Sequence, residues 1–237
     1  MRQHLDLEAI FHSPETDREW IAVEDRLATL FRVKDGATGS VNPGDRRAIY
    51  YLTRYLRPKS VLEIGTHVGG STLHFAAALI VDAGQLVTVD VEDVNASNGP
   101  WQKAGLGNSP RQLVESLGFA ADFVVADSVS FLRQKAETSE LFDLIFLDGD
   151  HACEKVRAEI PAALRVLAPG GVVLLHDYFP GGASCWSGCD PIRGPYEAAR
   201  QLQEEGAAIE AVPFAALPWP TKLGSSVTSL AALVSRG

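Results

Sequence analysis

The stretch that ends at His151 places two carboxylates and an imidazole directly after an apolar run. Residues 142–147 are mostly apolar, and Asp148, Asp150 and His151 follow within four positions. A neutral imidazole accepts a proton near pH 7, and a carboxylate does so when its pKa is raised. His151 is therefore the first candidate for a general base and Asp150 the second. The alternative is a histidine that only caps a helix or faces solvent.

A second stretch repeats this pattern, because the apolar run at residues 172–175 is followed by His176 and Asp177. If the two runs are neighbouring strands, Asp148 and Asp177 lie close together. Clustered carboxylates are costly unless a cation or a proton lies between them. A divalent cation with oxygen ligands satisfies them. Two alternatives stay open: a rim of solvated carboxylates, and one aspartate with a raised pKa that acts as a base without metal.

Residues 61–73 form an apolar run, a glycine-rich turn and the start of a helix, whose unpaired N–H groups can hold a polar ligand. Glu63, Gly65 and Gly69 follow a spacing different from the G-x-G-x-x-G of dinucleotide sites. The Glu63 carboxylate would repel a pyrophosphate and suits a cationic ligand. The pattern favours S-adenosylmethionine over NAD, and the alternative is a strand-turn-helix joint without a ligand.

Polar residues also end the next two apolar runs. Asp90 follows residues 86–89, where a carboxylate can accept both ribose hydroxyls of a nucleoside. Asp127 and Ser128 follow residues 123–125 and are placed to hydrogen-bond an adenine edge. Each of these residues is also a good helix N-cap. Five such strand ends argue against capping as the explanation for all of them.

These side chains need a sheet that brings the strand ends to one edge. Apolar runs alternate with helical patterns, which predicts a parallel sheet with helices on both faces. We expect an α/β, Rossmann-like, doubly wound sheet of seven mostly parallel strands, with N-terminal helices at residues 14–31 and 45–56 and a C-terminal antiparallel hairpin. The expected strands are residues 61–64, 86–89, 123–125, 144–147, 172–175, 209–214 and 226–234.

Several connecting segments lack a regular pattern. Residues 36–44 are predicted to form a loop, and Gly170 and Gly171 a tight turn into the fifth strand. Residues 91–110 and 179–195, which contain Trp101 and Trp186, follow strand ends. They are either walls of a substrate site or surface loops.

Composition excludes several classes of protein. The chain has 237 residues, 46% of them hydrophobic, which fits a small helical cap segment at residues 1–57 and one large domain at residues 58–237. The net charge of −9 argues against nucleic-acid binding. The chain shows neither an apolar run long enough to span a membrane nor a signal peptide, so we expect a cytoplasmic protein.

Three cysteines do not predict a disulfide framework, and Cys185 with Cys189 lacks the second ligand pair of a zinc site. The amphipathic helix around Trp20 can pack on its own domain or on a partner subunit, which leaves a homo-oligomer open.

Five of these stretches together resemble the class I S-adenosylmethionine-dependent methyltransferases, and within them the cation-dependent small-molecule O-methyltransferases. The resemblance covers residues 41–180 and lies in residues 61–72, 87–90, 126–128, 142–151 and 167–178. Residues 41–45 look like the segment that caps the methionine end of the cofactor in catechol O-methyltransferase. Residues 147–151 and 176–178 look more like sugar O-methyltransferases of antibiotic pathways, which implies natural-product biosynthesis.

The resemblance implies that Glu63, Gly65 and Ser71 hold the amino-acid end of the cofactor, Asp90 its ribose, and Asp127 with Ser128 its adenine. The full cofactor-binding set expected is Glu63, Gly65, Thr66, Gly69, Ser71, Asp90, Asp127, Ser128 and Asp148.

The resemblance also implies a divalent cation, Mg²⁺ first, at Asp148 and Asp177. His176 stands where the sugar-modifying enzymes have a carboxylate, and Tyr178 where the catechol enzymes have an asparagine. His176 is thus the candidate third ligand. Because imidazole is softer than a carboxylate, Mn²⁺, Fe²⁺ or Zn²⁺ are alternatives.

Three functions follow. The first is metal-assisted methyl transfer to a hydroxyl group of a small molecule, with His151 or Asp150 as base. The second is a metal-independent O- or N-methyltransferase that uses His151 or His176 as base. The third is a cofactor-binding protein without catalysis.

Overall fold

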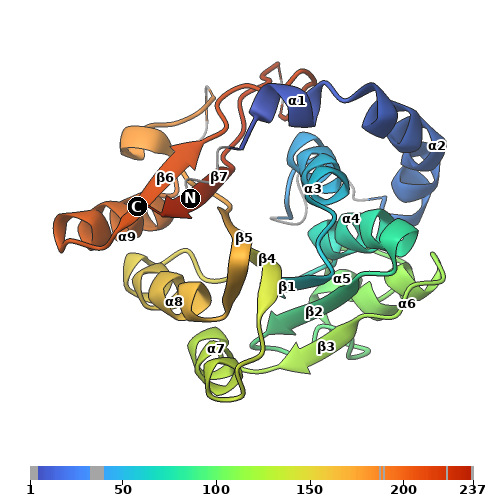
Figure 1. The fold of residues 1–237 in the computed structure, drawn as a ribbon. Helices are drawn as coiled ribbons and strands as arrows, with labels where there is room; N and C mark the ends of the chain where they lie inside the picture. Colours follow the sequence, from blue (N-terminus) through green and yellow to red (C-terminus); the bar gives the residue numbers. More distant parts are fainter. Residues whose placement is uncertain (1–4, 33–39, 187, 189, 223, 236–237) are drawn as a thin grey trace.

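The predicted sheet is present, and all seven strands belong to it (Figure 1). The computed structural model describes residues 5–32, 40–186, 188, 190–222 and 224–235. The strand order is β3-β2-β1-β4-β5-β7-β6, and only β7 runs antiparallel to its neighbours β5 and β6. The strands are β1 Ser60–Ile64, β2 Gln85–Asp90, β3 Asp122–Val125, β4 Phe142–Leu147, β5 Leu167–Leu175, β6 Ile209–Pro213 and β7 Ala231–Ser235.

Helices cover both faces of the sheet because successive residues of each inner strand point to opposite sides. Leu144 and Phe146 of β4 pack in the core under α3 and α4, whereas Ile145 and Leu147 pack in the core under α7 to α9. The helices are α1 Leu7–Phe11, α2 Pro14–Leu30, α3 Pro43–Leu56, α4 Gly70–Leu79, α5 Pro100–Lys103, α6 Pro110–Glu115, α7 Ser128–Glu137, α8 Cys153–Arg165 and α9 Gly194–Glu204. The described residues contain no helix both long and apolar enough to cross a membrane.

The register of the sheet brings the strand ends together at one edge. Leu147 of β4 is paired with Ile64 of β1 on one side and with Leu175 of β5 on the other. The residues that follow these three strands therefore meet. The prediction that β4 and β5 are neighbours is confirmed.

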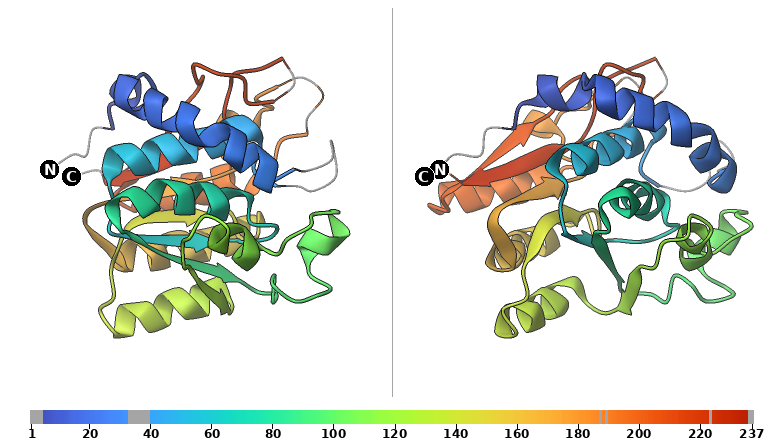
Figure 2. Two further views of the ribbon diagram at one scale, coloured as in Figure 1. Left: turned by 90° about the vertical axis from the view of Figure 1, so that its right-hand side faces the viewer. Right: turned by 45° about the vertical axis from the view of Figure 1, so that its right-hand side comes forward.

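The N-terminal helices form a layer outside α3 and α4 (Figure 2). The Ser13 side chain caps α2, as predicted, by accepting a hydrogen bond from the Thr16 N–H. The α3 helix begins two residues before the predicted start because Asn42 caps it and Pro43 fits its first turn. Trp20 packs edge-on against Tyr50, with 5.3 Å between ring centroids. The amphipathic helix thus packs on its own chain.

Some local predictions were wrong. Gly170 and Gly171 do not form a turn before the fifth strand but lie inside β5, where the pairing with β4 is irregular. A Cβ on Gly171 would lie 2.8 Å from the Asp143 carbonyl oxygen, so glycine permits this close approach. The segment 91–110, expected to lack regular structure, contains α5. Residues 36–39 of the predicted loop and Cys189 lie outside the described residues.

Candidate functional site

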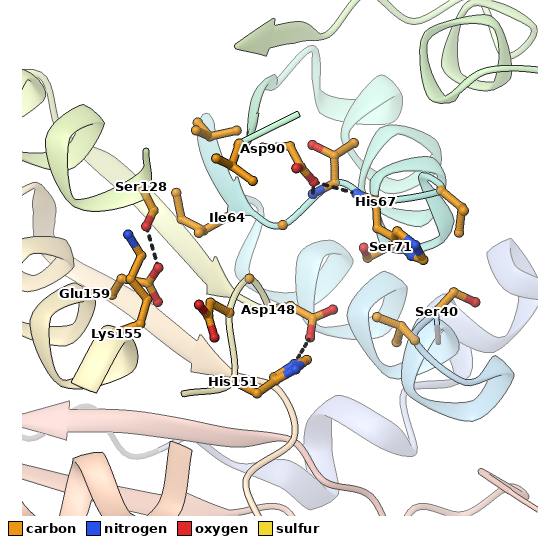
Figure 3. A pocket seen from close by; sticks show the side chains of 18 of the residues that line it. Ser40, Ile64, His67, Ser71, Asp90, Ser128, Asp148, His151, Lys155 and Glu159 are labelled. Atoms are coloured by element: carbon orange, nitrogen blue, oxygen red, sulfur yellow. Dashed lines mark hydrogen bonds and ion pairs between the residues drawn. The ribbon is translucent and has the colours of Figure 1, made fainter. Parts of the chain in front are cut away.

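A cavity of about 600 Å³ opens where β1, β2 and β4 end (Figure 3). Its walls come from the β1–α4 turn and from the segments that follow β2, β3 and β4. Ser40 and Val41, just before α3, close one side. Strand ends of an open α/β sheet are the usual place for a ligand.

The β1–α4 turn depends on glycine. Gly65 has φ +95°, and a Cβ there would lie 2.1 Å from the backbone oxygen of Asp148. Gly69 has φ +81° and donates its N–H to the Thr66 carbonyl. Gly65, Thr66 and Ser71 line the cavity, whereas Gly69 shapes the turn from outside the lining.

Glu63 lies beneath this turn, not among the residues that line the cavity. It is fully buried and accepts hydrogen bonds from Ser71 Oγ at 2.5 Å, Thr72 Oγ1 at 2.6 Å and Thr88 Oγ1 at 2.7 Å. Burial raises its pKa to about 7, although the hydrogen bonds from these three hydroxyl groups act to lower it. Glu63 thereby ties β1 to β2 and to the start of α4.

Asp90 lines the cavity and also holds the turn. Its Oδ2 accepts hydrogen bonds from the Thr66 N–H at 3.1 Å and the His67 N–H at 2.9 Å. Its Oδ1 accepts one from the Glu92 N–H at 3.1 Å. The carboxylate is therefore oriented by backbone groups.

Asp127 is the N-cap of α7, so capping accounts for part of its role. Its Oδ1 accepts the Ser130 N–H at 2.9 Å at the start of α7, and its Oδ2 pairs with Lys155. The hydrogen bond from Lys155 lowers the Asp127 pKa to about 2. Ser128 lines the cavity and donates to Glu159 Oε1 at 2.5 Å.

The sequence interpretation missed Glu159. It stands on the apolar stripe of α8 that includes Val156, Ile160 and Ala163, and it is buried there. A glutamate on a buried helix face was the available signal.

Asp148, His151 and Asp177 converge at the rim, with one potential ligand atom of each lying within 4.8 Å of the others. His151 Nε2 lies 3.5 Å from Asp148 Oδ1 and 3.2 Å from Asp177 Oδ2. The hydrogen bond to Asp148 raises the His151 pKa. Burial opposes the charge on Asp148, but His176 and His151 outweigh it and lower its pKa. Asp150 also lines the cavity, and its Oδ1 accepts the Ala152 N–H.

His176 is held on both ring nitrogens. Nδ1 lies 2.9 Å from Asp148 Oδ1, and Nε2 lies 3.3 Å from Oδ2 of Asp45, which the sequence interpretation also missed. Burial disfavours a charge on His176, but Asp148 and Asp177 raise its pKa well above the usual value. Asn42 Nδ2 donates to the same Asp45 oxygen at 2.7 Å. The His176 imidazole thus lies buried between the carboxyl groups of Asp148 and Asp45.

These contacts change the candidate metal set. With both nitrogens turned to carboxylates, His176 is poorly placed to be the third ligand. Among the described residues, the cluster that could hold a cation is Asp148, His151 and Asp177. Two carboxylates and one imidazole suit Mn²⁺, Fe²⁺ or Zn²⁺ better than Mg²⁺.

Comparisons with known proteins identify the family of the chain. A family model described as a methyltransferase domain matches residues 62–178. A protein of Mycobacteroides abscessus named as an O-methyltransferase is 30% identical over 179 residues, which cover 74% of this chain and 76% of the relative.

Solved structures show the same fold. An O-methyltransferase from Bacillus cereus in complex with SAH aligns with a TM-score of 0.59 at 21% identity, covering 96% of this chain and 94% of that one. TomG from Streptomyces achromogenes, an O-methyltransferase involved in tomaymycin synthesis and solved with SAM, aligns with a TM-score of 0.59 at 20% identity. That alignment covers 93% of this chain and 98% of TomG.

Proposed function

Because the chain belongs to the class I S-adenosylmethionine-dependent O-methyltransferases, we propose that it methylates a hydroxyl group of a small molecule at the rim formed by Asp148, His151 and Asp177. The observation that most supports this proposal is that Asp148 and His151 belong both to this cluster and to the wall of the cavity. A cofactor bound in the cavity would therefore lie next to side chains that can accept a proton or stabilise the charge that it brings.

The cavity walls suggest how the chain holds its cofactor. Gly65, Thr66 and Ser71 would bind the amino-acid end, together with the first N–H groups of α4. Asp90 would accept the ribose hydroxyls, and Ser128 with Asp127 would meet the adenine. We assign Glu63 and Gly69 to shaping the turn. When bound, the cofactor supplies a methyl group activated by its sulfonium.

His151 is the proposed base. Methyl transfer forms a bond between the acceptor oxygen and the methyl carbon, breaks the S–C bond, and releases S-adenosylhomocysteine. The hydroxyl proton passes to the neutral imidazole of His151, at the ring nitrogen that does not face the carboxylates, and the imidazolium that forms lies beside Asp148 and Asp177, whose charges stabilise it. Residues 1–57 would act as a cap, since Ser40 and Val41 close the cavity.

A screen of hydroxylated small molecules with methyl-labelled cofactor tests this function. The expected result is labelled product with wild type, and a loss of about 100-fold or more in His151→Ala when the cofactor is saturating. Glu154→Gln, an exposed change on α8, is the matched control. Failure of calorimetry to detect binding of S-adenosylmethionine would refute the proposal.

A divalent cation at Asp148, His151 and Asp177 is the second proposal, favoured by their convergence. A bound cation would lower the pKa of the acceptor hydroxyl. Asp150 would then be the carboxylate left to accept its proton. Calorimetric titration with Mn²⁺ should give a stoichiometric site in wild type and none in Asp177→Asn. Full activity in EDTA with no Mn²⁺ binding would leave the metal-independent route through His151.

A further inference from the structure

One end of the cavity holds a carboxyl group that the reaction does not use. Ser128, Lys155 and Glu159 lie together there, apart from Ser40 and His67 (Figure 3). Glu159 lines the cavity although its side chain is 1% exposed. A carboxyl group in such a place is costly unless hydrogen-bond donors meet it.

The described residues supply one such donor, a hydroxyl group. Ser128 Oγ donates to Glu159 Oε1 at 2.5 Å, and in the described part of the chain no donor meets Oε2. The neighbouring Lys155 is paired with Asp127. Burial raises the Glu159 pKa to about 7. An ionised carboxylate has about four lone-pair sites. After the bond from Ser128, the Glu159 carboxyl group can therefore still accept hydrogen bonds from a ligand in the cavity.

The position of this end indicates which part of the cofactor it meets. The sulfonium must lie by the acceptor, near Asp148 and His151, and Asp90 is placed for the ribose. The purine then falls at the end that contains Ser128. Adenine carries one hydrogen-bond donor group on its ring system, the exocyclic amine, and a carboxylate is an acceptor.

We propose that Glu159 determines purine specificity, accepting a hydrogen bond from the exocyclic amine of the cofactor's adenine through the oxygen that Ser128 does not use. This inference rests on the proposed cofactor and its orientation in the cavity. Ser128 holds the Glu159 carboxyl group by its hydrogen bond, and Glu159 is buried on α8.

Calorimetric binding of two ligands tests the inference without an acceptor. One ligand is S-adenosylhomocysteine, and the other is S-inosylhomocysteine, in which a carbonyl oxygen replaces the amine. Wild type should bind the adenine compound at least about tenfold more tightly, because the carbonyl would face a carboxylate. Glu159→Gln should shrink or invert this ratio, since its amide can donate to the carbonyl. Glu154→Gln should keep it.

Each result has one meaning. A wild-type ratio near one overturns the role of Glu159 while the proposed cofactor stands, and this measurement does not depend on how the variant folds. An equal loss of both ligands in Glu159→Gln identifies a structural residue and also overturns the inference. If wild type binds neither compound, the proposed function and the inference fail together.

Discussion

Three buried or partly buried carboxyl groups at the cavity differ in their neighbours, and these neighbours influence their charge. In the described part of the chain, Glu63 and Glu159 accept their side-chain hydrogen bonds from hydroxyl groups, and burial raises the pKa of each to about 7. Asp148 contacts two imidazoles, which lower its pKa despite burial. Asp148 is therefore the carboxylate that stays ionised at neutral pH, as a role beside a cation or an imidazolium requires.

The raised pKa of Glu159 makes its contribution to stability depend on pH. The folded chain holds this proton up to about pH 7, whereas the unfolded chain releases it near 4.5. The contribution is thus fully present below pH 4.5 and is lost as the pH rises through 7. Glu159→Gln carries no such proton. The free energy of unfolding of the variant relative to wild type should rise by about 2 kcal/mol between pH 5 and pH 8.

Urea unfolding at both pH values measures this difference. Glu154→Gln, exposed on the same helix, should show no such change. A difference between Glu159→Gln and wild type that does not vary with pH would contradict the assigned pKa shift.

His176 and Asp45 should be energetically coupled. His176→Gln removes the imidazole that lies between the Asp45 and Asp148 carboxyl groups, although Asp148 keeps its contact with His151. The variant should lower the free energy of unfolding by about 3 kcal/mol. Asp45→Asn in the same chain should restore part of the loss, because one uncompensated charge is gone. Urea unfolding of the two single variants and the double variant measures the coupling. Strictly additive losses would show that the two side chains act independently.

The sequence predicted which side chains reach the rim but not how they are held there. Asp90 ends a strand, and Asp148 and Asp177 follow strands, so their place at one edge of the sheet could be foreseen from the alternation of apolar runs. Asp45, the partner of His176, lies 131 positions away on α3. Apolar periodicity predicts that helix but not where it packs on the sheet. For this reason the choice between His176 and His151 as a third ligand could not be made from spacing.

Among the elements, the β1–α4 turn is under the tightest constraint. Its first glycine combines a left-handed backbone with a Cβ position 2.1 Å from the Asp148 carbonyl oxygen. Any side chain there must move the segment after β4, which carries Asp148 and His151. The position of the β1–α4 turn is therefore coupled to the positions of Asp148 and His151.

Gly65→Ala should lower the affinity for S-adenosylhomocysteine at least about tenfold and destabilise the chain by about 3 kcal/mol, through strain and backbone displacement. Gly118→Ala is the control, since Gly118 has φ +81° but nothing within 4 Å of the Cβ position. It should cost only about 1–2 kcal/mol and leave affinity unchanged. Calorimetry and urea unfolding check both variants. Equal affinities in the two variants would remove the link between turn and site.

Long elements could be predicted because apolar periodicity and capping residues agree, as Ser13 and Pro14 do for α2. The irregular start of β5 could not. Its glycines have the composition of a turn, but pairing with β4 keeps them in the strand. Here a tertiary contact overrides a local preference.

At the scale of the whole molecule, the N-terminal helices and the sheet share one hydrophobic core. Phe11 of α1 packs on Phe214 and Trp219, which lie more than 200 positions away along the chain. Arg54 of α3 forms ion pairs with Glu19 of α2 and with Asp82, in the segment after α4. This assembly keeps Ser40 and Val41 against the cavity.

Arg54 should be the charged group that contributes most to holding the N-terminal helices in place. It is 6% exposed, and its guanidinium meets Glu19 at 2.7 and 3.0 Å and Asp82 at 2.5 Å. Arg54→Met leaves two partly buried carboxylates unpaired and should cost about 3 kcal/mol. Arg54→Lys keeps the charge but not the planar fork, so it should recover only part of this loss.

The surface pair Arg200–Glu204 is the matched control, with side chains 45% and 59% exposed. Arg200→Met should change the free energy of unfolding by less than about 0.5 kcal/mol, because water already screens an exposed pair. Urea unfolding followed by tryptophan fluorescence checks all three variants, since Trp20 and Trp219 lie in the shared core. A cost for Arg54→Met no greater than that for Arg200→Met would mean that apolar packing alone holds the N-terminal helices in place.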